Sequence, residues 1–259
     1  MKLVRTIAAA VLLTAASSLC ATEIPQAERR SGYSFMTPET QAIQNDDTAN
    51  PGMLWVLDGE KLWNSKTGAV AKACTDCHTD ASASMKGVAA RYPAFDKALG
   101  RPVNLEQRIN LCRAGKQQAS PLPYESHDLL ALTAFIARQS RDLPIEVGTD
   151  PQLQPFVAKG RELFTQRQGQ LNLSCSNCHD DNWDKRLAGS AVTQAHPTGY
   201  PIYRLEWQSL GSLQRRLRSC ITGIRAQTYG FGAPELVELE LYLKSRAQGM
   251  PVEAPAVRP

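Results

Sequence analysis

Apolar residues recur at intervals of three or four positions in two separate stretches of the chain. They are Leu129, Leu132, Phe135 and Ile136 in the first stretch, and Leu236, Leu239 and Leu243 in the second. This interval is the period of one face of an α-helix. Asp128 and Glu235 lie ahead of the two patterns, where a negative charge stabilises the first turn of a helix. The pattern therefore predicts the same helix twice.

The two halves of the chain share more than this helix. Residues 59–78 (GEKLWNSKTGAVAKACTDCH) align without gaps on residues 160–179 (GRELFTQRQGQLNLSCSNCH), and residues 92–112 align in the same way on residues 200–220. Two blocks that match and occur in the same order in both halves indicate an internal duplication. We expect two tandem, mostly helical domains. Their predicted bounds are 51–143 and 151–259, with a turn-rich linker at 144–150 and an N-terminal extension at 22–50.

The N-terminus has the layout of a secretory signal peptide. Lys2 and Arg5 precede an apolar run at 7–19, and small residues follow. This run is too short to span a bilayer, so we expect cleavage of residues 1–21 and export to the periplasm. An uncleaved anchor is the alternative. Cys20 follows the bulky Leu19, which is unlike a lipidation site. No later apolar stretch is long enough for a membrane span.

Net charge argues against two classes of partner. Without Lys2 and Arg5, 27 basic residues face 25 acidic ones. This balance is too even to predict binding of nucleic acid or of anionic membranes. The 17 Gly and 16 Pro, with few aromatic residues, favour short helices joined by loops over a large sheet.

Each repeat carries a Cys-x-x-Cys-His motif, CTDCH at 74–78 and CSNCH at 175–179. The spacing places two thiols on one face of a helical turn, where they can add to the vinyl groups of haem while the histidine ligates iron. We expect two covalently bound haem c groups, attached through Cys74, Cys77, Cys175 and Cys178, with His78 and His179 on the irons. The alternatives are one zinc shared by the two pairs, or a redox dithiol.

No matched pair of methionines follows the two motifs, so the usual sixth iron ligand is missing. Two lone cysteines stand at a suitable distance instead: Cys112 is 34 residues after His78, and Cys220 is 41 after His179. We expect both as axial thiolates, which stabilise ferric iron and lower its potential. A Cys112–Cys220 disulfide and two inert buried thiols are the alternatives. His127 and His196 have no counterparts in the other repeat and are expected at the surface or at caps.

Arginines surround the second lone cysteine. Arg216 precedes Cys220 by one helical turn, so both lie on one face of a helix. Arginine forks gather oxyanions in partly dehydrated pockets, which favours the second haem as the catalytic one. Arg108 occupies the equivalent position in the first repeat, so a shared structural role for Arg216 stays open. Arg215 and Arg225 are expected on a solvated face.

This combination of two CxxCH motifs, a lone Cys in place of Met, and Arg216 before Cys220 closely resembles the SoxA family. The resemblance covers nearly the whole chain after the leader and implies an all-α fold of two tandem class I cytochrome c-like domains. It implies that Cys220 ligates the active-site haem and can carry a persulfide, and that Arg216 lines the substrate channel. It also implies two partners: SoxX, a monohaem cytochrome that forms the heterodimer, and SoxYZ, a carrier protein.

The function expected from the resemblance is that of an L-cysteine S-thiosulfotransferase. It joins thiosulfate oxidatively to a cysteine of SoxYZ and passes electrons through haem to SoxX and a downstream cytochrome c. Forming the S–S bond needs a sulfur handler and an electron sink together, and a thiolate on ferric haem supplies both. The alternatives are a thiosulfate dehydrogenase that forms tetrathionate, a non-catalytic dihaem electron carrier, and a module that only binds sulfur compounds or nitric oxide.

Overall fold

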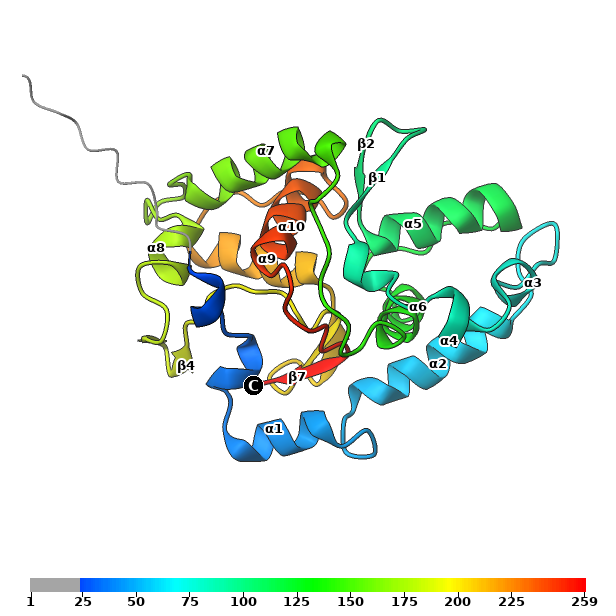
Figure 1. Cartoon of the computed structure of the whole chain (residues 1–259), viewed down its shortest axis with the longest axis horizontal. Helices are drawn as coiled ribbons and strands as arrows, with labels where there is room; N and C mark the ends of the chain where they lie inside the picture. The colour runs from blue at the N-terminus through cyan, green and yellow to red at the C-terminus, as the bar shows by residue number, and fades with distance from the viewer. Residues whose placement is uncertain (1–23) are drawn as a thin grey trace, which may run out of the picture.

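The structure, a computed structural model, describes residues 24–259. The predicted signal peptide and Cys20 lie outside these residues. Figure 1 shows two halves beside each other, with the elements of the second repeat around α10 and those of the first around α6. Within residues 24–259, no helix combines the length and the hydrophobicity needed to cross a bilayer.

The elements follow the same order in the two repeats, except that α4 of the first repeat is replaced by the hairpin β3–β4 in the second. The first contains α2 (Gly52–Asn64), α3 (Thr75–His78), α4 (Ala81–Ser84), β1 (Ala94–Asp96), β2 (Arg101–Val103), α5 (Leu105–Cys112) and α6 (His127–Arg138). The second contains α7 (Gln154–Thr165), α8 (Cys175–His179), β3 (Arg186–Leu187), β4 (Ser190–Ala191), β5 (Ile202–Arg204), β6 (Ser209–Gly211), α9 (Leu213–Gly223) and α10 (Pro234–Arg246). The predicted pair of amphipathic helices is thus confirmed as α6 and α10.

One long helix packs against another in each repeat, α2 on α6 and α7 on α10. The contacts run through the apolar faces that the sequence pattern predicted, with Leu129, Leu132 and Leu236 buried. Asp128 and Glu235 lie in the first turns of these helices, as expected from the helix dipole. Each helix pair forms the frame from which the CxxCH segment of that repeat extends.

The chain is mostly helical, but the expectation of an all-α fold was too strict. Within the described residues, strands form two small two-stranded sheets, β1–β2 and β3–β4, and a three-stranded sheet in the order β6-β5-β7. The last strand, β7 (Ala256–Arg258), pairs in parallel with β5. These strands are two or three residues long, so no alternation of apolar and polar positions could reveal them. The hairpins β1–β2 and β5–β6 are equivalent in the alignment of the repeats.

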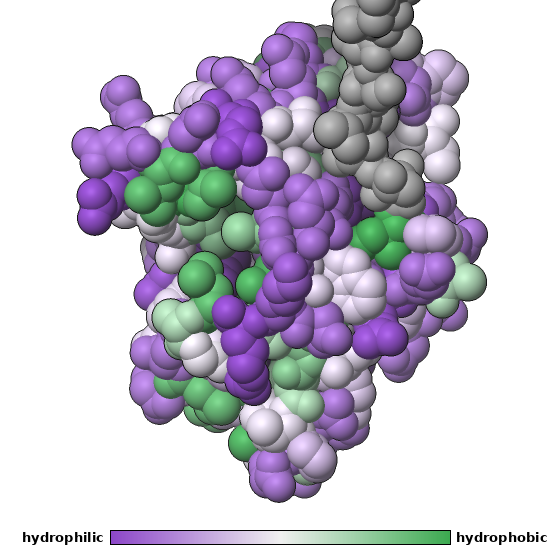
Figure 2. Space-filling model, turned by 90° about the vertical axis from the view of Figure 1, so that its left-hand side faces the viewer, coloured by the Kyte–Doolittle hydropathy of each residue, from purple (hydrophilic) through white to green (hydrophobic). Residues whose placement is uncertain are grey.

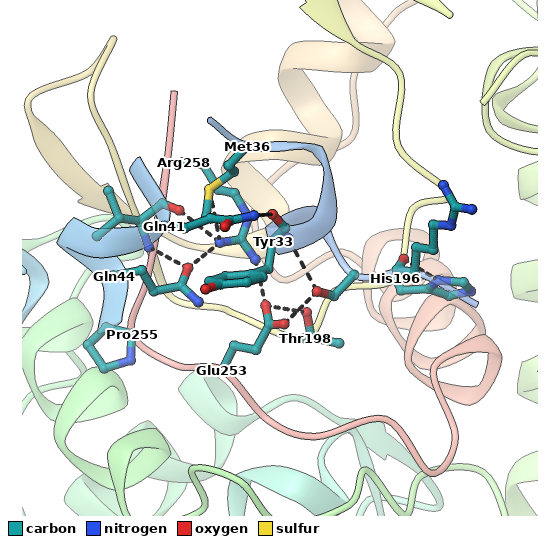
Figure 3. Close-up of polar contacts among 12 residues, drawn as sticks. Tyr33, Met36, Gln41, Gln44, His196, Thr198, Glu253, Pro255 and Arg258 are labelled. Atoms are coloured by element: carbon teal, nitrogen blue, oxygen red, sulfur yellow. Dashed lines mark hydrogen bonds and ion pairs between the residues drawn. The ribbon is translucent and has the colours of Figure 1, made fainter. Parts of the chain in front are cut away.

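The N-terminal extension packs on the C-terminal segment of the second repeat, and its end also contacts the first repeat, where Asp47 pairs with Arg138 and Arg141. It contains two 3-10 turns (Gln26–Glu28 and Gly32–Phe35) and α1 (Pro38–Asn45), and α1 contacts β7. Figure 3 shows Arg258 bonded to Gln44 and Glu253. Ser31 Oγ also donates to Glu253, at 2.5 Å. The extension and the C-terminus therefore stabilise each other.

The surface on the side of α8 and β4 is largely hydrophilic. Figure 2 shows this side, where hydrophobic residues gather in separate patches between hydrophilic ones. Leu171 and Leu187, from the segments on either side of α8, are among the exposed large hydrophobic residues. Apolar side chains left open near the CxxCH motif are a surface that a bound apolar group would cover.

A buried polar cluster joins the two repeats. Asn104, the N-cap of α5, donates through Nδ2 to Glu240 Oε1 of α10 at 3.2 Å. Burial raises the pKa of Glu106 to about 7 and that of Glu240 to about 8, and the charge of Glu106 adds to the shift at Glu240. Burial also lowers the pKa of Lys244 to about 8. The contact between repeats therefore depends on which of these groups hold a proton.

This cluster predicts a pH-dependent stability. Each carboxyl binds its proton more tightly in the folded than in the unfolded chain, so the free energy of unfolding should fall as pH rises from about 5 to about 8. The slope is at most about 1.4 kcal/mol per pH unit for each proton. Glu240→Gln keeps an acceptor oxygen but cannot ionise, so it should flatten this slope in denaturant titrations of the holoprotein. The lowered pKa of Lys244 has the opposite effect, so this group makes the free energy of unfolding rise with pH above about pH 8.

The exposed residue Glu60 offers a matched control. Glu60→Gln removes one carboxylate from the surface of α2 and should leave the slope as in the wild type. If the slope of Glu240→Gln equals that of the wild type, burial does not shift the titration of this cluster.

Candidate haem and sulfur site

The CxxCH motifs form short helical turns, α3 in the first repeat and α8 in the second. A capping box fixes the start of α8, because Ser174 accepts from the backbone of Asn177 and Asn177 accepts from that of Ser174. At the start of α3, Asp76 accepts from the N–H of Ala73 at 2.9 Å. The predicted thiols and histidines are therefore carried on turns of helix, as haem attachment requires.

His179 is oriented by a hydrogen bond to the backbone. Its Nδ1 lies 2.6 Å from the carbonyl oxygen of Thr193. Because a carbonyl only accepts, Nδ1 carries the proton and Nε2 keeps its lone pair. Burial lowers the pKa of His179, so the ring stays neutral. A neutral imidazole with a bonded Nδ1–H is the form that ligates a metal, and the bond fixes the direction of the ligand.

The residue after this histidine ties the motif to the core of the second repeat. Asp180 accepts from Arg246 of α10 at 2.5 Å, and both side chains are almost fully buried. Arg246 also lies over the ring of Phe164, with its guanidinium carbon 4.6 Å from the ring centre. Removing one partner of such a pair leaves an uncompensated buried charge, so the second motif is firmly positioned.

The first motif is supported by an aromatic ring instead. The ring of Trp63 in α2 lies 5.6 Å from that of His78, and its Nε1 is buried without a hydrogen-bond partner. A buried N–H without an acceptor costs about 1–3 kcal/mol. Beside a haem-attachment motif, the carboxylate of a haem propionate is an acceptor of suitable chemistry. These residues therefore fit a bound haem in the first repeat.

Each lone cysteine lies near the CxxCH pair of its own repeat. Cys112 is the last residue of α5 and Cys220 lies in α9. Burial raises the pKa of Cys175 to about 12, and the neighbouring Cys220 adds to the shift. Burial also raises the pKa of Cys74, with a further contribution from Cys112.

Among residues 24–259, Cys112 and Cys220 are not bonded to each other. The same part of the chain brings no three Cys, His, Asp or Glu residues together in a group that could hold a metal ion.

The equivalent arginines of the repeats have different surroundings. Arg108 donates to Asp96 at 2.5 Å and to the hydroxyl of Tyr92 at 3.2 Å. Arg216 has no carboxylate within ion-pair distance among residues 24–259. It is close enough to His179 to help lower the pKa of that residue, after the larger effect of burial. The ion pair that Arg108 makes with Asp96 is therefore not repeated by Arg216 among the described residues.

The remaining histidines differ from each other. His127 begins α6 and is about half exposed near Asp58. His196, expected at the surface or at a cap, is buried, and its Nδ1 lies 2.9 Å from the carbonyl oxygen of Arg30. Burial lowers its pKa to about 4, so it stays neutral and holds the N-terminal extension. No local pattern indicates this contact, because the two residues are 166 positions apart in the chain.

Three residues that the sequence analysis passed over stand near the site: Trp63, Thr193 and Arg204. Thr193 acts through its backbone carbonyl oxygen, which every residue has, so its residue type does not indicate this role. Arg204 could have been found, because the alignment of the repeats places it opposite Asp96.

Comparison with known proteins agrees with this geometry. The family model of the SoxA/TsdA cytochrome c domain matches residues 58–145 and 159–252. The chain belongs to the SoxA/TsdA cytochrome c family. A cytochrome c domain implies covalently bound haem c, and the thiols and histidines described above fit it.

Named relatives lie on the SoxA side of this family. The L-cysteine S-thiosulfotransferase subunit SoxA of Pseudaminobacter salicylatoxidans is 39% identical over 235 residues, which cover 90% of this chain and 82% of the relative. The protein of the same name from Rhodovulum sulfidophilum is 39% identical over 231 residues, which cover 89% of this chain and 80% of the relative. The crystal structure of SoxXA from P. pantotrophus superposes with a TM-score of 0.86 at 31% identity, covering 89% of this chain and 87% of that chain.

Haem content tests the two attachment sites. The wild type should carry two haems that survive denaturation, counted by the pyridine haemochrome spectrum and by intact mass. Replacing both Cys175 and Cys178 by Ala removes the thiols of the second site, so one haem should remain. The double variant Cys112→Ala and Cys220→Ala is the matched control and should keep two. A wild type with one covalent haem would contradict the assignment.

Proposed function

We propose that this chain is the dihaem subunit of an L-cysteine S-thiosulfotransferase. In the proposed arrangement, the first haem c is held by Cys74, Cys77 and His78, and the second by Cys175, Cys178 and His179. Cys112 and Cys220 would supply the remaining protein ligands of the two irons. The second repeat carries the active site, with Cys220 as the sulfur ligand that handles substrate and Arg216 as an anion-binding residue.

The observation that carries this proposal is the difference between the two lone cysteines. Both lie beside a CxxCH pair, but of the two equivalent arginines near them only Arg216 has no carboxylate partner in the described part of the chain. Arg108, the counterpart near Cys112, is neutralised by Asp96. Thiosulfate is a dianion, so a site with an unpaired arginine beside a sulfur ligand attracts it, and a neutralised site does not.

The proposed reaction balances without any further reagent except an electron acceptor. Thiosulfate and the carrier thiol give the carrier S-thiosulfonate, one proton and two electrons. An S–S bond forms between the sulfane sulfur and the carrier sulfur, and the S–H bond of the carrier is lost. Bound haem c supplies one-electron acceptors at this point. Arg216 compensates the negative charge of the substrate while its sulfur approaches Cys220.

The relatives support a proposal for the partners, and the predicted leader supports one for the compartment. The related crystal structure is that of SoxXA, so we propose a heterodimer with a monohaem SoxX that receives the electrons. The proposed acceptor of the thiosulfonate is a cysteine of a SoxYZ carrier. The leader predicted at residues 1–21 supports a periplasmic location.

The test is conjugation in a purified system. The chain with its monohaem partner, the SoxYZ carrier, thiosulfate and ferricytochrome c should yield carrier whose cysteine has gained a thiosulfonate group in its intact mass. Cys220→Ala should slow this at least about 100-fold, because it removes the sulfur at the reacting centre. Cys112→Ala, the same change in the other repeat, should keep most of the rate.

Two results would contradict the proposal. Formation of tetrathionate from thiosulfate alone, with the carrier unmodified, would favour a thiosulfate dehydrogenase. Equal losses in Cys112→Ala and Cys220→Ala would mean that the second repeat does not hold the active site.

A further inference from the structure

The repeats differ by a reversal of charge next to their equivalent arginines. The alignment places Arg216 opposite Arg108 and Arg204 opposite Asp96. The structure keeps this equivalence, because Asp96 and Arg204 are the last residues of β1 and β5, each the first strand of its hairpin. The partner that neutralises the arginine in the first repeat is thus replaced by a second arginine in the second repeat.

Arg204 is buried, with only 7% of its surface exposed. Its Nε has no hydrogen-bond partner, and its guanidinium carbon lies 5.2 Å from the ring centre of Trp207. Burial lowers its pKa, and the next largest cause is the charge of Arg216. The equivalent side chains of the first repeat, Asp96 and Arg108, are in direct contact, so the matching hairpin brings Arg204 towards Arg216. The Nε–H of Arg204 has no acceptor among the described residues.

The acid near Arg204 does not neutralise this pair. Glu206 accepts from the Nη2 of Arg204 at 3.1 Å, but its side chain is 52% exposed. Solvent screens an exposed carboxylate, and such ion pairs contribute little. Two positive charges against one screened negative charge leave this pair positive, whereas Arg108 and Asp96, its counterparts in the first repeat, neutralise each other.

We infer that Arg204 and Arg216 together hold an oxyanion beside Cys220, and that this oxyanion is the sulfonate end of thiosulfate. The inference rests on the proposed function and adds Arg204 as a specificity-determining residue. A buried guanidinium beside a partly exposed one is costly without an anion, and the three oxygens of a sulfonate can accept from both forks. The sulfane sulfur is then the end left to meet the carrier thiol.

The experiment compares three variants of Arg204 in the holoprotein complex. Arg204→Asp restores the charge pattern of the first repeat, Arg204→Gln removes the charge, and Arg204→Lys keeps it. Thiosulfate binding is measured directly by calorimetry, and KM and kcat are measured in the conjugation assay. We expect Arg204→Gln to weaken binding and raise KM roughly 10- to 100-fold, as expected for a lost charge-assisted contact. Arg204→Asp should lose more thiosulfate affinity than Arg204→Gln, and Arg204→Lys should lose less. In all three variants, kcat at saturating thiosulfate should change little.

Arg215→Gln is the matched control. Arg215 lies over the same Trp207 ring, 4.1 Å from its centre, and pairs loosely with Glu125 at 3.9 Å. Arg215→Gln removes a positive charge next to the same ring as Arg204→Gln does. It should nevertheless change thiosulfate affinity by less than about threefold. If Arg215→Gln loses as much thiosulfate affinity as Arg204→Gln, the loss depends on overall positive charge and not on Arg204, and the inference is wrong.

A haem propionate is the other source of an oxyanion for this pair, and the spectrum separates the two. If Arg204→Gln shifts the potential and the spectrum of one haem while thiosulfate affinity stays as in the wild type, Arg204 pairs with a propionate and the inference is wrong. Because binding is measured without turnover, a wild type that binds thiosulfate but modifies no carrier would contradict the proposed function and leave the affinity comparison intact.

Discussion

Two helices in each repeat approach so closely that the crossing position has no room for a side chain. A Cβ added at Gly59 would lie 2.2 Å from the carbonyl oxygen of Ala131, and one at Gly160 would lie 2.1 Å from that of Glu238. Both glycines open the matched block that ends in CxxCH, so the duplication kept the crossing together with the motif. The backbone of Trp63, one turn past the first crossing, accepts from the N–H of Cys74 at 3.1 Å. The helix crossing therefore determines where the haem-attachment turn begins.

On this shared frame the two sites have become different. The first has its arginine neutralised by Asp96 and its histidine packed on a tryptophan ring. The second has a histidine fixed by Thr193, an adjacent ion pair between Asp180 and Arg246, and unpaired positive charge. A firmly held histidine beside unpaired positive charge suits chemistry on an anion, because the donors are in place before the substrate arrives. A neutral site suits storage or transfer of electrons.

Periodic and repeated features could be predicted from the sequence. The helices α6 and α10 and the CxxCH turns depend on local patterns, and the comparison of the halves revealed the duplication. Contacts between distant segments could not be predicted in this way. The strand β7 joins β5 from the far end of the chain, and His196 bonds to Arg30 across 166 positions. Arg204 is an intermediate case. The alignment of the repeats places it opposite Asp96, but its role can be inferred only once the contact between Arg108 and Asp96 is known.

The central claim is that Cys220 is the sulfur ligand of the second iron, and low-temperature EPR of the ferric protein tests it most directly. We predict two low-spin signals of thiolate character. One should disappear in Cys220→Ala and the other in Cys112→Ala, because each cysteine serves the haem of its own repeat. Signals typical of His/Met or His/His ligation, unchanged by either substitution, would contradict the account and leave an electron carrier with two idle thiols.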